Sequence, residues 1–242
     1  FNYREIFINE IVYKNLLMYY IFMNILSIDS SGPQLSVAIK QDDKIFYKQY
    51  EKDKRASKII LSTIDNLLIK NNISLASINA IVFNKGPASF TGTRVAAAVT
   101  QAIGYTHNIP VLGISSMSLM AYVYHTKSKK IKFICIKKAY GKMFYIAKFD
   151  INKNKFEPIN QIDLVNFKDI RLVNDSYYVL DCFNEFNNTS NNKLATLINF
   201  SHEDYILDAK SILTYAENNC SFDSSFKLEE TFPDYANHNI EN

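Results

Sequence analysis

The first half of the chain alternates between short apolar runs and longer segments with helical spacing. Apolar and polar residues alternate over 24–29, 35–40 and 44–50, which predicts three strands separated by turn residues. Short apolar runs at 80–83 and 111–114 predict two further strands. Because the first three strands follow one another through turns, we expect them to form an antiparallel meander.

Apolar residues recur at helical spacing in the segments that follow these strands. The spacing predicts helices at 57–70, 93–106 and 116–125, with Ser57 as a candidate N-cap. Strands that return through helices run parallel to a neighbour, so we expect a mixed sheet. The order is similar to that of the ribonuclease-H-like half of actin, sugar kinases and Hsp70. We therefore expect an α/β fold of the ASKHA (actin-like/ribonuclease-H-like) type, with two duplicated mixed-sheet lobes and flanking helices.

The second half of the chain carries a weaker version of the same pattern. Apolar runs predict strands at 131–136, 143–149 and 177–180, and helical spacing predicts a helix at 208–218. The segment 151–175 is polar and weakly periodic, and it predicts no element. The duplication is an expectation about architecture, because no repeat is visible in the sequence itself.

Residues 1–22 differ from the rest of the chain. Their apolar run at 16–22 is too short to span a bilayer, and no small-residue cleavage site follows it. A docked helix and a membrane or signal segment are the alternatives to an upstream extension. We expect an N-terminal extension at 1–22, whose place in the native protein the sequence leaves open, a first domain with partner-binding helices at 23–126, and a divergent second domain at 127–242.

Charge and cysteine usage exclude several classes of protein. The chain has 27 basic and 24 acidic residues and a net charge of +3, so any contact with nucleic acid needs a local patch. The three cysteines, Cys135, Cys182 and Cys220, show no CxxC spacing, which argues against a disulfide framework or a structural zinc site. We expect a protein of a reducing compartment, cytoplasmic and without a membrane partner.

The segment 85–94 lies between a predicted strand and a predicted helix and combines glycines with hydroxyl groups. Such a loop, ending at a helix N-terminus, can hold an anion or fix a sharp turn. Its spacing is neither that of a P-loop nor that of a dinucleotide fingerprint. The phosphate interpretation and a purely structural one have equal weight. The candidate phosphate-loop residues are Gly86, Ser89, Thr91, Gly92 and Arg94.

A second candidate lies at the end of the first predicted strand. Asp29, Ser30 and Ser31 place a carboxylate and two hydroxyls in a hairpin turn, where a phosphate and its metal could bind. Turn residues that cap a hairpin explain the same pattern equally well.

Catalytic and metal-binding patterns are missing from the sequence. The four histidines include no pair at i, i+4, so we expect no HExxH-type or HxxxH-type metal site. Ser89 lacks a GxSxG elbow, and Cys135 lies in an apolar run that is typical of core. We expect no catalytic residue. The histidines are His107, His125, His202 and His238.

The predicted helix at 93–106 is rich in alanine, which would let another helix approach closely. Beside the helix at 57–70, it could form one half of a helix-bundle contact. Packing on its own sheet is the alternative, and both can hold because a helix has two sides. The candidate interface residues are Ile60, Ile64, Leu67, Val95, Ala98, Val99 and Ala102.

Four segments of the chain resemble the TsaB (YeaZ) family. They read ILSIDSS at 25–31, SVAI at 36–39, GPASFTGTRVA at 86–96 and PVLGISSM at 110–117. The resemblance is specific over 23–121 and thin beyond. The chain departs from the family pattern at Ala88, where glycine is usual, and at three segments, KRAS at 54–57, KKAYG at 137–141 and PDYAN at 233–237.

The resemblance implies a non-catalytic subunit that binds and activates TsaD through the helices at 57–70 and 93–106. With TsaE, the complex would transfer threonylcarbamoyl to adenosine 37 of tRNAs that read ANN codons, and the chain would reach tRNA through the complex. Alone, it could form a homodimer through the same surface. No cofactor is firmly implied, and ATP or ADP with Mg at the partner interface stays open. The main alternative is a small-molecule kinase or ATPase of the ASKHA fold, and a peptidase ranks behind both.

Overall fold

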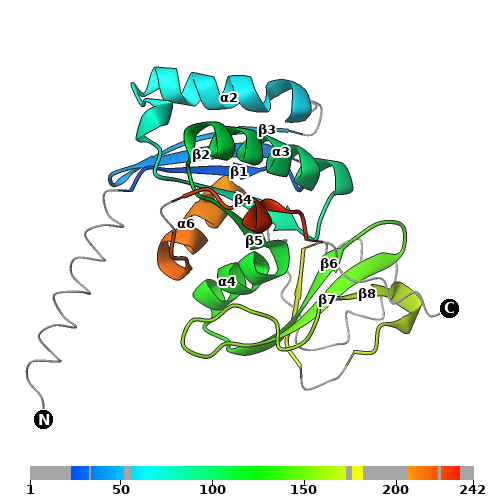
Figure 1. The fold of residues 1–242 in the computed structure, drawn as a ribbon. Helices are drawn as coiled ribbons and strands as arrows, with labels where there is room; N and C mark the ends of the chain where they lie inside the picture. The colour runs from blue at the N-terminus through cyan, green and yellow to red at the C-terminus, as the bar shows by residue number, and fades with distance from the viewer. Residues whose placement is uncertain are drawn as a thin grey trace, which may run out of the picture.

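The computed structural model describes residues 23–32, 34–51, 56–172, 176–181, 207–222 and 225–234. The expectations for residues 1–22, for Lys54 and Arg55, for Cys182, for His202 and His238, and for residues 235–242 fall outside this part of the chain. Two mixed sheets with flanking helices form the described structure (Figure 1).

The first sheet contains all five strands that the first half of the sequence predicts. Its order is β3-β2-β1-β4-β5, in which β1, β2 and β3 form an antiparallel meander and β1, β4 and β5 are parallel. The expected meander and the expected parallel pairs are therefore confirmed. The strands are β1 (Ile25–Asp29), β2 (Leu35–Gln41), β3 (Lys44–Tyr50), β4 (Ala80–Gly86) and β5 (Val111–Ser115).

Helices cover both faces of this sheet (Figure 1). The helices α2 (Ala56–Lys70) and α3 (Phe90–His107) lie on one face. On the other face lie α4 (Ser116–Ser128) and α6 (Ala209–Asn219). Side-chain alternation in the central strand explains the two-sided core, because Leu26 and Ile28 point toward α2 and α3 while Ile25 points toward α4 and α6.

The second sheet packs on α4 from the side opposite to the first sheet (Figure 1). Its order is β8-β7-β6-β9, with β6 and β9 parallel and the other pairs antiparallel. The strand β8 was not expected, because its four residues lie in the polar segment that predicted no element. The strands are β6 (Lys132–Lys138), β7 (Met143–Asp150), β8 (Asp163–Asn166) and β9 (Tyr178–Leu180).

The last part of the described chain returns to the first sheet. Helix α6 packs on β1, β2 and β4. The segment 225–234, which we call the C-terminal strap, then crosses β5 and α3 and contains the short helix η4 (Leu228–Thr231). Gln101 of α3 donates to the Thr231 hydroxyl at 2.9 Å, and the Asp234 amide donates to the Lys85 carbonyl at 2.7 Å.

Three of the residues expected at a partner interface are not exposed in the structure. Ile60, Ile64 and Leu67 are buried in the core between α2 and the sheet. The physical reason is that the apolar stripe of an amphipathic helix covers its own sheet. The outward side of α2 carries Leu61 and Ile69 instead. Within the described ranges, no helix is both long and apolar enough to cross a membrane.

Candidate functional site

The hairpin between β1 and β2 and the loop between β4 and α3 meet at one end of the first sheet. The chain reverses sharply after β4, where Gly86 has a φ of 97° and precedes a cis peptide bond to Pro87. Such a φ favours glycine. Ala88 does not share it, so alanine costs no backbone strain at the position where the TsaB (YeaZ) pattern has glycine.

The hydroxyls and amides of these two turns hydrogen-bond to one another. The Ser30 hydroxyl donates to the Gly92 carbonyl at 2.7 Å, and the Ser89 amide donates to the Ser31 carbonyl at 3.0 Å. The Ser31 amide donates to the Asp29 carboxylate at 2.9 Å. The structure thus brings the two candidate turns together and uses these groups to join them.

Gly92 allows this close approach of helix and hairpin. A Cβ atom placed there would lie 1.8 Å from the Ser30 carbonyl oxygen and 2.9 Å from its carbon. Both are backbone atoms, so no side-chain rotation could relieve the overlap. Glycine is therefore required at this position for contact rather than for an unusual φ.

The remaining loop residues begin helix α3. Ser89 is the N-cap, and its hydroxyl accepts from the Gly92 amide at 3.4 Å, which explains why the helix begins at Phe90 rather than at the expected residue 93. Arg94 donates to the Phe90 carbonyl at 2.9 Å, and its guanidinium lies 3.2 Å from the centre of the Phe90 ring. Thr91 is exposed. The arrangement forms a strand-to-helix junction, and its chemistry explains the motif without a phosphate.

Asp29 is almost fully buried beneath this junction. Burial raises the pKa of its carboxyl from 3.8 to about 6, although the Ser31 hydrogen bonds and the charge of Lys137 oppose the shift. In the second sheet, Lys137 forms an ion pair with Asp181 at 2.8 Å. Among the described residues, no three His, Cys, Asp or Glu side chains are grouped as a metal site.

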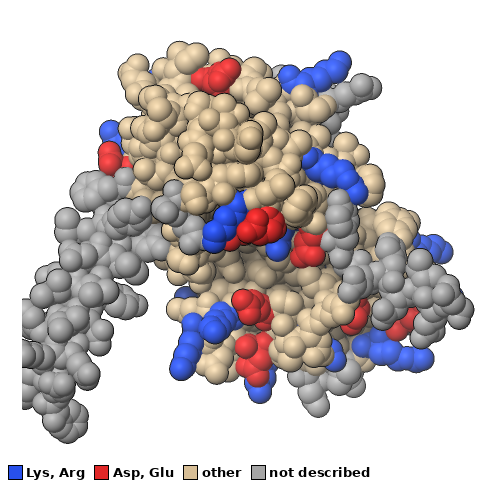
Figure 2. All heavy atoms as spheres, in the orientation of Figure 1, with Lys and Arg blue, Asp and Glu red and all other residues tan. Residues whose placement is uncertain are grey.

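The outward face of α2 and α3 is the main apolar surface of the first sheet. Leu61 and Ile69 on α2 are 58% and 75% exposed, and Phe90 and Tyr105 on α3 are 69% and 78% exposed. Between Val95 and Thr106, no exposed position of α3 carries a charge. Figure 2 shows this region, at the top of the view, as largely uncharged. We call it the α2–α3 face.

The residues expected at an interface divide between this face and the core. Ala98 and Ala102 are exposed on α3, while Val95 and Val99 are half-buried against the core. Sequence reasoning missed the four large exposed residues of the α2–α3 face. A signal was present, because Leu61 and Ile69 each follow a core residue of α2 by one position and so lie off its core stripe.

Comparisons with known proteins relate the chain to proteins of threonylcarbamoyl modification of tRNA. The family model "TsaD: tRNA N6-adenosine threonylcarbamoyltransferase" matches residues 50–179. The chain is 33% identical over 130 residues to the tRNA threonylcarbamoyladenosine biosynthesis protein TsaB of Buchnera aphidicola subsp. Acyrthosiphon pisum, which covers 54% of this chain and 59% of that protein. It is 30% identical over 99 residues to the protein of the same name from Escherichia coli, covering 41% of this chain and 43% of that protein.

Two solved structures share the fold. One is YeaZ from Pseudomonas aeruginosa, with a TM-score of 0.68 and 16% identity over 88% of this chain and 99% of that chain. The other is an uncharacterized protein with similarity to peptidase YEAZ from Pseudomonas aeruginosa, with a TM-score of 0.71 and 16% identity over 89% of this chain and 100% of that chain. At this identity, the likeness shows the fold alone.

The chain spans about half the length of the curated relatives that it matches. The family model covers more than half of the chain, and the curated relatives from Buchnera aphidicola, Haemophilus influenzae and Escherichia coli share the name TsaB. These matches agree with the motifs at 25–31, 86–96 and 110–117, and the chain therefore belongs to the TsaB/YeaZ family.

Proposed function

We propose that this chain is a non-catalytic subunit that binds and activates TsaD in the formation of threonylcarbamoyladenosine at position 37 of ANN-decoding tRNAs. TsaE is the third component of the proposed complex, and tRNA is reached through it. The proposal includes the ASKHA assignment, with one ribonuclease-H-like unit built on each sheet. The expected boundary between 126 and 127 separates the two sheets, but α6 and the C-terminal strap, which follow it in the chain, pack on the first sheet. The names of the curated relatives, all of them TsaB proteins of this biosynthesis, support the pathway.

The observation that carries the proposal is the exposed apolar α2–α3 face. Large exposed apolar patches of a monomer often have a binding role. On α2 the exposed Asp65 lies one turn from both Leu61 and Ile69, so the uncharged part of the face lies mainly on α3. Large exposed residues surround Ala98 and Ala102, whose small side chains allow a partner helix to approach the α3 backbone. The face thus combines small and large apolar side chains, which suits packing against helices of a partner.

The junction at the start of α3 supports a structural role for the loop motif at 86–94. Its hydrogen bonds fix the N-terminal end of α3 against β1, and Gly92 sets the distance between them. A rigid N-terminal end fixes the direction of the whole helix, and with it the α2–α3 face. We therefore assign the motif the task of holding α3 in its binding position.

A kinase or ATPase of the same fold is the weaker alternative. The hydroxyl of Ser30 and the amides of Ser31 and Ser89, which a phosphate would need as donors, are engaged with protein atoms. Binding of ATP or ADP with Mg at the partner interface is tested by calorimetry of the isolated chain and of the complex. Tight nucleotide binding by the chain alone would favour the alternative.

The test is pull-down of TsaD by the chain, combined with reconstituted tRNA modification. Ala98→Trp should abolish capture while the monomer keeps its unfolding transition, because the bulky ring prevents close approach at an exposed site. The matched control is Ala76→Trp, at an exposed alanine outside α2 and α3. A homodimer of the free chain should be lost with the same Ala98 variant. Normal capture by Ala98→Trp, or modification that proceeds without the chain, contradicts the proposal.

A further inference from the structure

A groove of about 580 Å³ lies on the second sheet, at the end where β6 begins and β7 ends. Lys130, Lys132 and Lys148 line it together with a single carboxylate, that of Asp150. Ile134 and other apolar side chains contribute most of the remaining lining, together with Ser176 and Tyr177. The groove therefore combines a basic rim with an apolar floor.

Backbone pairing fixes the positions of the groove lysines. The register of β6 with β7 places Lys132 opposite Asp150, and Lys148 opposite Ile134. Lys132 forms an ion pair with Asp150 at 3.3 Å, in which both side chains are well exposed. Such a pair adds little stability and leaves the ammonium accessible to an anion.

Tyr177 orients the third lysine. The Lys130 ammonium donates to the Tyr177 hydroxyl at 3.0 Å and lies 4.2 Å from the centre of its ring. The Ile134 amide donates to the Tyr177 carbonyl at 2.8 Å, which anchors the tyrosine backbone beside β6. An aromatic ring beside a cation at the rim of a basic groove is a common element of nucleic-acid grooves.

The charge around the groove contrasts with the charge of the whole protein. Residues 127–172 contain twelve Lys or Arg and four Asp or Glu, which gives +8, whereas the whole chain carries +3. Lys127 and Lys129 lie at the C-terminal end of α4, directly before the groove, and Lys153 and Lys155 directly follow β7. Seven of these twelve basic residues lie at the groove or directly before or after it in the chain, and the other five lie toward the opposite end of the second sheet.

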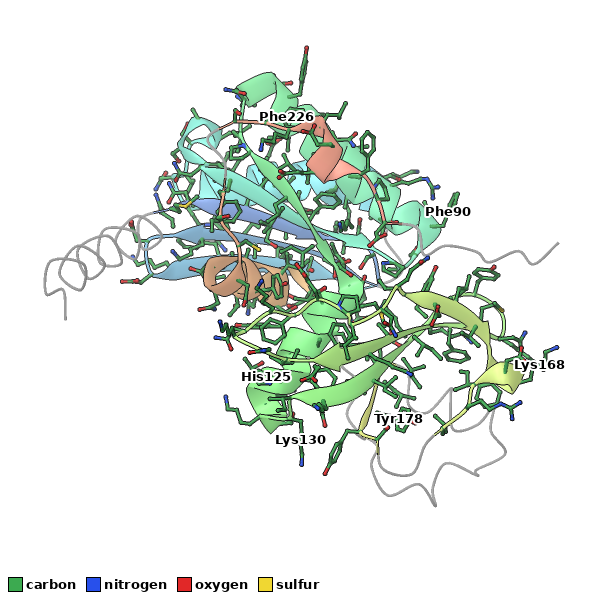
Figure 3. All side chains as sticks on the ribbon, turned by 60° about the horizontal axis from the view of Figure 1, so that its bottom comes forward. Phe90, His125, Lys130, Lys168, Tyr178 and Phe226 are labelled. Atoms are coloured by element: carbon green, nitrogen blue, oxygen red, sulfur yellow. The ribbon has the colours of Figure 1, made fainter. Side chains whose placement is uncertain are left out.

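The groove lies far from the α2–α3 face. In Figure 3, Lys130 and His125 are at the opposite end of the molecule from Phe226, which packs beside α3. Figure 1 places α2 and α3 on the far side of the first sheet from β6 and β7. A partner on the α2–α3 face would thus leave the groove open.

We propose that this groove binds the phosphate backbone of RNA. The inference rests on the proposed function to the extent that a tRNA is the RNA in question. Three lysines around a hollow can each approach a different phosphate, and an apolar floor suits ribose and base surfaces. An anionic membrane is a poorer fit, because a flat bilayer would not enter a groove.

The test measures binding of a fluorescent tRNA transcript to the isolated full-length chain, by anisotropy at several salt concentrations. The variant is Lys130→Gln/Lys132→Gln/Lys148→Gln. Its matched control, Lys44→Gln/Lys142→Gln/Lys168→Gln, removes the same charge at three exposed lysines outside the groove. Both variants should unfold at the temperature of the unaltered chain.

The groove variant should lose at least roughly tenfold in affinity at about 0.1 M salt, and its log–log salt slope should fall by about 2, as expected when up to three phosphate contacts are lost. The control should change affinity by less than about twofold. Equal weakening by both variants, no effect of the groove variant, or no binding by the isolated chain overturns the proposal. Tighter binding to anionic phospholipid vesicles than to RNA, lost with the groove variant, assigns the lysines to a membrane instead.

The two proposals fail separately in these measurements. A chain that captures TsaD and supports modification, but whose RNA affinity ignores the groove variant, overturns the groove alone. A chain that binds RNA through the groove but does not capture TsaD overturns the proposed function alone.

Discussion

The contact of Gly92 with Ser30 gives the sharpest test of the junction. Gly92→Ala places a methyl group 1.8 Å from the Ser30 carbonyl oxygen, and the hairpin must retreat by about 1.2 Å to reach the 3.0 Å at which the shortest real contacts begin. That movement breaks the 2.7 Å bond from Ser30 to Gly92 and the 3.0 Å bond from Ser89 to Ser31. The change therefore disturbs two hydrogen bonds with one methyl group.

The expected destabilisation follows from these losses. Two broken hydrogen bonds cost about 1–1.5 kcal/mol each, and residual overpacking costs about 1–3 kcal/mol. Replacing glycine in a helix returns up to about 1 kcal/mol. We expect the free energy of unfolding to fall by about 2–5 kcal/mol.

The measurement is equilibrium urea unfolding followed by circular dichroism, since the chain has no tryptophan for fluorescence. Gly32→Ala is the matched control in the same hairpin, because nothing lies within 4 Å of its added methyl group. We expect the control to change stability by less than about 0.5 kcal/mol. A Gly92→Ala variant as stable as the control would refute the argument that helix and hairpin are in direct contact.

Three further predictions concern other parts of the molecule. The pKa of the buried Asp29 carboxyl is raised to about 6, so the stability that this group contributes is full below about pH 4 and is lost as the pH rises through 6. Relative to the unaltered chain, Asp29→Asn should therefore gain on the order of 2–3 kcal/mol in free energy of unfolding between pH 4.5 and 7.5. A pH-independent difference in urea unfolding would contradict this. Thr231→Val removes the hydroxyl that accepts from Gln101 and donates to the Leu228 carbonyl. The variant should lose about 1–2 kcal/mol in free energy of unfolding, and proteolysis of the C-terminal strap should become faster. Unchanged cleavage would show that these bonds do not hold the strap. The Ile69 side chain is 75% exposed, so Ile69→Ser should change the free energy of unfolding by less than about 0.5 kcal/mol but weaken TsaD capture several-fold. Undiminished capture would show that α2 is not part of the interface.

The strands and the junction could be predicted because local patterns determine them. Alternation predicted all five strands of the first sheet, and the motif at 85–94 predicted a strand, a loop and a helix in the right order. The start of α3 was placed late because Ser89, not a later residue, caps the helix. The short strand β8 was missed because polar residues dominate its surroundings.

Which side of a helix faces a partner could not be predicted from the pattern alone. The stripe of Ile60, Ile64 and Leu67 was assigned to an interface, yet a sheet within the same chain covers it. Likewise, the mutual bonding of Ser30 and Gly92 depends on residues 62 positions apart, which no local pattern relates. Helical spacing predicted α6 but gave no information on the sheet that it would cover.

The position of α6 has a consequence for how the protein is made. On the face of the first sheet that α4 and α6 cover, Ile25 and Val82 pack against Ile212 and Ala216 of α6, which is translated long after β5. At roughly 5–20 residues per second, the ribosome needs about 5–20 s to travel from the end of α4 to the end of α6. During that interval the nascent chain lacks the helix that covers this part of the sheet in the folded protein.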